Sequence, residues 1–107
     1  MFNSNVKNVS AEEAYKLINE DKEFVILDVR TKEEYDSGHI PGAKLIPVQV
    51  LSTKLAELDK YKDKPVLVYC ASGGRSPRAV DTLACSDFTN LYHMSSGISS
   101  WRHNITK

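Results

Sequence analysis

The cysteine at position 70 lies where its neighbours can make it reactive. Four apolar residues, Val66–Tyr69, precede it, and Gly73 and Gly74 follow in the next few positions. This order predicts a strand, a tight loop and the start of a helix, because glycines accept positive φ and carry no Cβ. Amide groups at a helix N-terminus attract anions, and such a setting lowers the pKa of a thiol from about 8.5 towards about 7 or below. We therefore predict that Cys70 is a nucleophilic thiolate.

The other loop residues can complete an anion site around that sulfur. N–H groups that turn inward at the glycines would form a nest, and Arg75 adds a permanent positive charge at its rim. Ser72 and Ser76 could donate hydrogen bonds to bound sulfur or sulfonate oxygens, although local turn and N-cap bonding is the simpler role of such serines. The predicted loop and anion-binding residues are Ala71, Ser72, Gly73, Gly74, Arg75 and Ser76.

The segment 70–76, CASGGRS, is similar to the active-site loop of the rhodanese-like (sulfurtransferase) family. Further segments occur in the order and spacing of that family: LDVR at 27–30, EEY at 33–35, GHIPGA at 38–43 and GISSW at 97–101. The resemblance covers nearly the whole chain. It implies a five-stranded sheet with helices on both faces and sulfur transfer without a metal or nucleotide cofactor.

The remaining chain alternates between strand and helix patterns. Strands are predicted at 6–9, 24–27, 44–46, 65–69 and 91–94, and helices at 10–19, 48–58, 76–86 and 97–103. Another short helix should begin at a capping box at Thr31 and stop at Gly38. This alternation favours an α/β domain with a mainly parallel sheet, whose ligands bind outside the carboxyl ends of the strands.

Length and composition limit the organisation of the chain and its partners. With 107 residues, 41% of them hydrophobic and 26% charged, we expect a single domain over residues 1–107. The 14 basic and 14 acidic residues cancel, so we expect neither nucleic acid nor a membrane as partner. The first five residues do not resemble a leader, and no apolar run approaches the roughly 18 residues of a membrane span. We expect a cytoplasmic location.

The second cysteine is not expected to be a partner of the first. Cys85 lies near the far end of the helix predicted after the loop, on the order of 13 Å away. A disulfide needs Cα atoms within about 7 Å, so we interpret Cys85 as a packing residue or a surface thiol. His93 and His103 are isolated in the sequence, and no spacing is typical of a metal site.

Asp28 and Arg30 follow the second predicted strand and should emerge at the same edge of the sheet as Cys70. An exposed pair of this kind would contribute little to stability. Their position and the family resemblance favour a supporting role, either holding the loop or binding an anionic donor, and both alternatives stay open.

We interpret the chain as a sulfurtransferase that uses covalent catalysis. The Cys70 thiolate would take the outer sulfur of a small anionic donor such as thiosulfate and hold it as a persulfide. An acceptor would then remove this sulfur: cyanide in the test tube, or in the cell a thiol, including one supplied by a protein.

Two alternatives remain. Phosphatases and arsenate reductases related to this fold use five residues between cysteine and arginine, whereas four separate Cys70 from Arg75 and the next position is Ser76. A persulfide carrier or a regulatory binding module, by contrast, would have the same sequence features as the enzyme.

Overall fold

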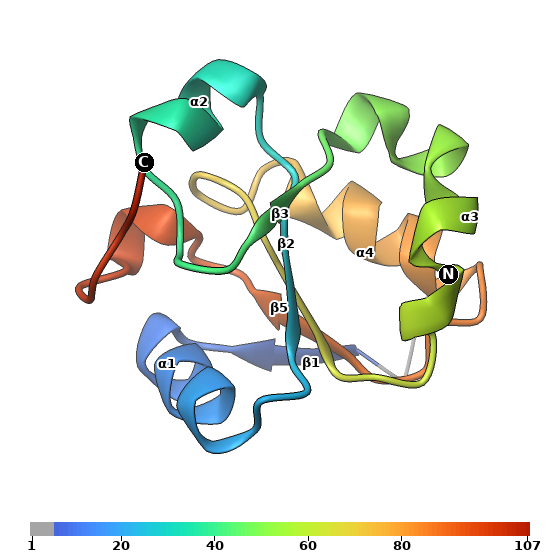
Figure 1. The fold of residues 1–107 in the computed structure, drawn as a ribbon, viewed down its shortest axis with the longest axis horizontal. Helices are drawn as coiled ribbons and strands as arrows, with labels where there is room; N and C mark the ends of the chain where they lie inside the picture. Colours follow the sequence, from blue (N-terminus) through green and yellow to red (C-terminus); the bar gives the residue numbers. More distant parts are fainter. Residues whose placement is uncertain (1–5) are drawn as a thin grey trace.

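The computed structural model describes residues 6–107, and the expectation about a leader in residues 1–5 lies outside this part. Its strands form one parallel sheet in the order β1-β5-β4-β2-β3 (Figure 1). They are β1 (Val6–Val9), β2 (Val25–Asp28), β3 (Lys44–Leu45), β4 (Val66–Tyr69) and β5 (Leu91–Met94). The predicted α/β class and the five strands are therefore confirmed, and the sheet is parallel throughout.

The helices are short and begin at the signals that the sequence carries. They are α1 (Ala11–Glu20), α2 (Lys32–Ser37), α3 (Leu55–Leu58) and α4 (Ser76–Ala84), with 3-10 segments η1 (Val48–Thr53), η2 (Asp59–Tyr61) and η3 (Ile98–Ser100). Both capping boxes form, Ser10 with Glu13 before α1 and Thr31 with Glu34 before α2. Each box satisfies backbone N–H groups that the first turn of a helix leaves free.

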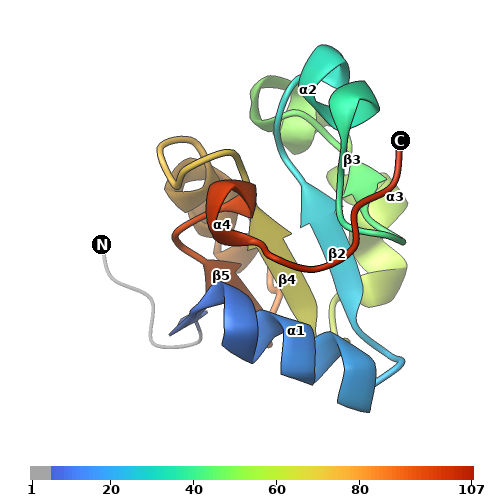
Figure 2. The ribbon, with the colours of Figure 1, turned by 90° about the vertical axis from the view of Figure 1, so that its left-hand side faces the viewer.

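Two apolar layers enclose the sheet, because successive strand residues point to opposite faces. Leu27 and Val68 face η1, α3 and α4, and Leu83 of α4 completes that layer. Leu67 and Tyr69 face α1 and the segment around Ile98 and Trp101. In Figure 2, α1 and the C-terminal segment lie in front of the sheet, with α3 and α4 behind it. Helices on both faces are what the family resemblance implied.

The predicted helix over residues 48–58 is wrong as a single element. The chain makes the 3-10 segment η1, interrupts it at Lys54 (φ −109°, ψ 4°), and only then forms α3. Two β-branched valines and Thr53, whose hydroxyl bonds to the carbonyl of Val50 at 2.7 Å, disfavour a regular α-helix here. The apolar face nevertheless forms, because Leu51 and Leu58 are both buried.

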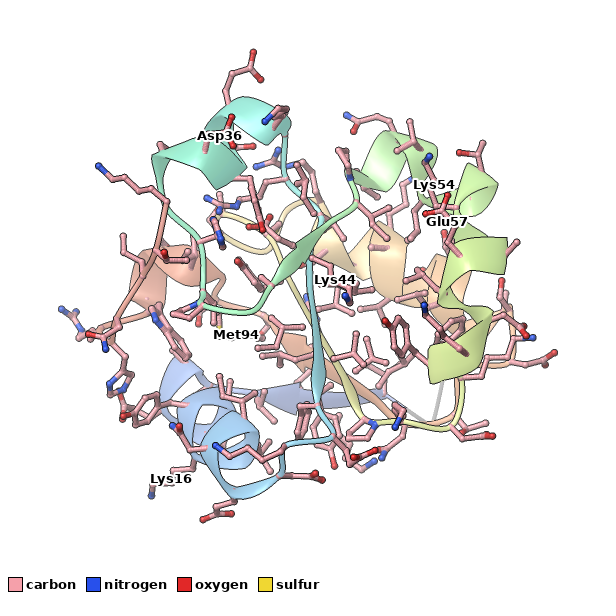
Figure 3. The ribbon with its side chains drawn as sticks, viewed as in Figure 1. Lys16, Asp36, Lys44, Lys54, Glu57 and Met94 are labelled. Carbon is pink, nitrogen blue, oxygen red and sulfur yellow. The ribbon has the colours of Figure 1, made fainter. Side chains whose placement is uncertain are left out.

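The C-terminal helix predicted over residues 97–103 is likewise only the 3-10 turn η3. Charged side chains such as Lys16 of α1 and Asp36 of α2 point outward, whereas Met94 lies in the interior (Figure 3). No helix within residues 6–107 has the length and apolar character needed to cross a bilayer.

Candidate active site

Cys70 follows β4 directly and opens a loop, residues 71–75, at the same end of the sheet as α2 (Figure 1). Its side chain is 1% exposed. The N–H of Gly73 donates a hydrogen bond to Sγ at 3.1 Å, and Ser76 Oγ lies 3.3 Å from the same sulfur. The carbonyl of Cys70 accepts a hydrogen bond from the N–H of Ile98 at 2.9 Å. The loop therefore surrounds the sulfur, while the backbone of Cys70 is held by the segment after β5.

Opposing influences act on the Cys70 thiol. Burial raises its pKa, because desolvation disfavours the thiolate. Hydrogen bonds from the Ser76 hydroxyl and from the amides of Arg75, Ser76 and Gly73 lower it, and the net pKa lies below the ordinary value of a thiol. Among the predicted loop residues, Ser72 and Gly74 are exposed and Ala71 is half-buried. The amides, rather than the Ser72 hydroxyl, make the nest.

Two glycines allow the loop to touch the turn that follows β5. Gly73 has φ +96°, and a Cβ at this position would lie 2.1 Å from the carbonyl oxygen of Ser95. Gly97 has φ +74°, and its Cβ would lie 2.3 Å from the carbonyl oxygen of Ala71. Both conformations and both approaches exclude a side chain. The sequence motif at 97–101 thus includes a residue that shapes the loop from outside it.

Arg75 points to α2 and forms a forked ion pair with Glu34. Its Nη1 and Nη2 lie 2.7 Å and 2.9 Å from the two carboxylate oxygens. The same carboxylate caps α2 through Thr31. Hydrogen bonds from Arg75 are the main reason that the pKa of Glu34 falls to about 2. Sequence reasoning assigned Glu34 to the capping box but missed this pair, since 41 residues separate its members.

Asp28 and Arg30 form a buried bidentate pair, with contacts of 2.9 Å and 2.7 Å. The Tyr69 hydroxyl donates to the Asp28 carboxylate at 2.8 Å and accepts the N–H of Ile40 at 3.1 Å. Arg30 also donates to the carbonyl of Gly38 at 2.7 Å. These contacts anchor neighbouring backbone, which is neither of the two roles considered for this pair, holding the loop or binding an anionic donor. They fix residues 38–40, not the loop after β4.

A polar chain that the sequence did not reveal starts at the cysteine. Beyond Ser76, whose side chain is fully buried, His93 Nε2 lies 2.6 Å from the serine Oγ. His93 Nδ1 lies 3.2 Å from Asn8 Oδ1 on β1. The one available signal was a histidine inside the apolar strand β5, and nothing in the sequence indicated its partners.

Cys85 is an exposed, free thiol that follows α4, which agrees with the second of the two roles considered for it. Cys70 is free as well. Within residues 6–107, no group of three or more His, Cys, Asp or Glu side chains is placed to hold a metal ion.

A family model, the rhodanese-like domain, matches residues 10–104 of this chain. The chain belongs to the rhodanese-like domain family. A rhodanese-like domain protein from Staphylococcus aureus has a TM-score of 0.83 at 30% identity, over 94% of this chain and 96% of that one. The predicted family and fold are thereby confirmed.

Relatives of this rhodanese-like chain include proteins named as sulfurtransferases. The thiosulfate sulfurtransferase GlpE of Coxiella burnetii (strain RSA 331 / Henzerling II) is 33% identical over 101 residues, which cover 90% of this chain and 87% of GlpE. A sulfurtransferase of Allochromatium vinosum is 28% identical over 101 residues, covering 94% of this chain and 92% of that protein. The alignments span most of each relative.

Replacing Gly73 with alanine should disrupt the loop, whereas replacing Gly74 should not. Alanine at 73 combines positive φ with a clash against a backbone carbonyl, so we expect the free energy of unfolding to fall by about 2 kcal/mol or more. Gly74 has open space around its position, and Gly74→Ala should change that energy by less than about 0.5 kcal/mol. Urea unfolding measures both, and equal effects would contradict the proposed contact with Ser95.

Glu34→Gln should destabilise the protein at neutral pH but not in acid. The folded pKa of Glu34 is about 2 and lies below its ordinary value of 4.5, so the charged pair stabilises the fold above pH 4.5 and loses its effect as the pH falls towards 2. Because the carboxylate is one-third exposed, we expect a difference of about 1 kcal/mol at pH 7.

The matched control for this measurement is Asp36→Asn, which removes an exposed ion pair with Lys32 on the same helix. Urea unfolding between pH 7 and pH 3 should show almost no effect of that control. A Glu34→Gln difference that stays constant with pH would rule out the ion pair as its cause.

Proposed function

We propose that this protein moves a sulfane sulfur from an anionic donor such as thiosulfate to cyanide or a thiol through a persulfide on Cys70. The main support is the setting of the Cys70 sulfur. The N–H of Gly73 donates to Sγ with an N···S distance of 3.1 Å, and the thiol has a pKa below its ordinary value. A thiolate in such a setting is a nucleophile. The naming of relatives as sulfurtransferases supports the same chemistry.

In the first step, the Cys70 thiolate attacks the outer sulfur of thiosulfate. A bond forms between Sγ and this sulfur, the S–S bond of the donor breaks, and its electron pair leaves with sulfite. In the second step, cyanide attacks the outer sulfur of the persulfide, thiocyanate departs, and the thiolate is restored. Charge and electrons balance without a further reactant, and the loop amides would stabilise negative sulfur in both states.

Arg75 would attract the doubly charged donor to the loop. Its guanidinium is 34% exposed, and Glu34 engages two of its five N–H donors. The ion pair holds this charge at the rim of the loop, adjacent in sequence to Ser76, which contacts the sulfur.

The geometry also weighs against phosphoryl chemistry. Four residues separate Cys70 from Arg75, and the guanidinium forks onto a carboxylate of α2. Sulfur carriage, in contrast, shares the first step of the proposed reaction and differs only in the donor and acceptor.

The decisive experiment follows the mass of the protein incubated with thiosulfate and then with cyanide. We expect the wild type to gain one sulfur atom and to lose it to cyanide with formation of thiocyanate. Cys70→Ala should gain none, and Cys85→Ala should behave as the wild type because its thiol is exposed and lies beyond α4.

Each alternative has its own outcome in this assay. Loading by a protein persulfide but not by thiosulfate would indicate a carrier. Absence of loading by both, together with hydrolysis of an aryl phosphate, would indicate a phosphatase and overturn the proposal.

Arg75→Ala should raise the KM for thiosulfate about tenfold, because a charged hydrogen-bond donor contributes about 1.5 kcal/mol or more to binding an anion. The control is Arg78→Ala, which removes an exposed arginine one turn further along α4. Steady-state kinetics of thiocyanate formation measures both variants. An unchanged KM in Arg75→Ala would remove this residue from the donor site.

A further inference from the structure

A line of polar side chains connects the Cys70 sulfur with β1, the strand at one edge of the sheet. Sγ lies 3.3 Å from Ser76 Oγ, this oxygen lies 2.6 Å from His93 Nε2, and His93 Nδ1 lies 3.2 Å from Asn8 Oδ1. Cys70, Ser76 and His93 are all buried, with exposed fractions of 1%, 0% and 7%. This line of side chains thus runs from the end of β4 through α4 and β5 to β1.

The contact with Asn8 favours one tautomer of the histidine. A side-chain carbonyl oxygen only accepts hydrogen bonds, so the Nδ1 beside Asn8 carries the proton. Burial lowers the pKa of His93, which favours the neutral ring. Nε2 then carries a free lone pair that points at the Ser76 hydroxyl.

Ser76 has one proton for two neighbours. While Cys70 is a thiol, every contact is satisfied: S–H donates to Oγ, and O–H donates to His93 Nε2. When the sulfur ionises, the Gly73 N–H still donates to it, but the Ser76 hydroxyl can turn to the thiolate only by leaving the imidazole. The contact of 2.6 Å between Oγ and Nε2 has the length of a hydrogen bond, so the imidazole and the thiolate compete for this proton.

We propose that His93 takes up the proton of the Cys70 thiol through Ser76, an inference that rests on the proposed role of Cys70 as the nucleophile. The S–H bond breaks and its proton passes to Oγ, while the proton of Ser76 passes to Nε2. The sulfur keeps the electron pair, so a thiolate and an imidazolium replace two neutral groups with no change in net charge. In the product, Nε2–H donates to Oγ, and O–H donates to the thiolate.

The Cys70 thiol is the titratable group that the side-chain contacts of His93 lead to, because its direct partners, Ser76 and Asn8, are neutral. From α4 His93 meets the Ser76 hydroxyl, and from β1 the neutral amide of Asn8. The nearest lysine on β1, Lys7, bonds to Asn90 and lies over the ring of Tyr92, which points to the other face of β5. Within residues 6–107, His93 makes no ion pair with a carboxylate or a cation.

The test is the pH dependence of alkylation of Cys70 by iodoacetamide, in a Cys85→Ala background that leaves one thiol. In His93→Phe the thiol proton has no acceptor, and we expect the inflection to rise by about one pH unit, with about tenfold slower alkylation below it. If His93 merely competes for the Ser76 hydroxyl, its removal frees that hydroxyl for the thiolate and the inflection falls. The two models therefore differ in the sign of the shift.

A second variant at position 93 keeps the proposal testable if His93→Phe does not fold. His93→Gln keeps a polar side chain that bonds to Ser76 but does not take up a proton, so the proposal again expects a rise of about one pH unit. An inflection that stays in place or falls would overturn the proposal. Ser76→Thr should keep the parent inflection, because it retains the hydroxyl, and Ser76→Ala should raise it.

A direct readout is the charge of the His93 ring, measured by NMR of the imidazole nitrogens just above the alkylation inflection. We expect the ring to keep its proton to a higher pH in the parent protein than in Cys70→Ala, because the thiolate stabilises the imidazolium. A neutral ring in both would overturn the proposal. Alkylation and ring titration need no sulfur donor, so they answer independently of the mass-spectrometric test of sulfur transfer.

Discussion

The site depends on a contact between two stretches of backbone at the carboxyl edge of the sheet. The loop after β4 and the turn after β5 approach so closely that Gly73 and Gly97 leave no room for a Cβ. Positive φ at Gly73 aims its N–H at the Cys70 sulfur, and hydrogen bonds from the N–H groups of Ile98 and Ser99 hold the loop carbonyls. An anion site made of amides needs this rigidity, because dipoles stabilise charge without reorganisation only when they are already in place.

Two ion pairs secure the same end of the molecule in different ways. Asp28 and Arg30 are buried, and a buried pair is tolerated only when its remaining hydrogen-bonding capacity is used. The Tyr69 hydroxyl and the Gly38 carbonyl provide those partners. The pair of Glu34 and Arg75 is partly exposed, so its contribution to stability is smaller. The same carboxylate that caps α2 also sets the position of Arg75 beside the loop after β4.

Local signals in the sequence predicted much of this arrangement. The capping boxes, the apolar runs of the strands and the glycine-rich loop each depend on residues a few positions apart, and they predicted most of the elements and the strand, loop and helix start around Cys70. The break at Lys54 was missed because the spacing of leucines predicts a face but not the regularity of the helix beneath it. The contacts of His93 were missed because Asn8 lies 85 residues away, and only the pairing of β1 with β5 brings the two together.

The hydrogen-bonding groups around the Cys70 sulfur differ in how they respond when the thiol ionises. The amide of Gly73 keeps its proton at every pH, so its hydrogen bond favours the thiolate at all times. The Ser76 hydroxyl can donate to only one neighbour, and its direction depends on whether the His93 ring needs a donor or supplies one. The fixed amides set the base level of thiol acidity, and the movable proton couples it to a second titrating group. A buried serine between a thiol and an imidazole is thus more than an N-terminal helix residue: it determines in which direction the charge can move.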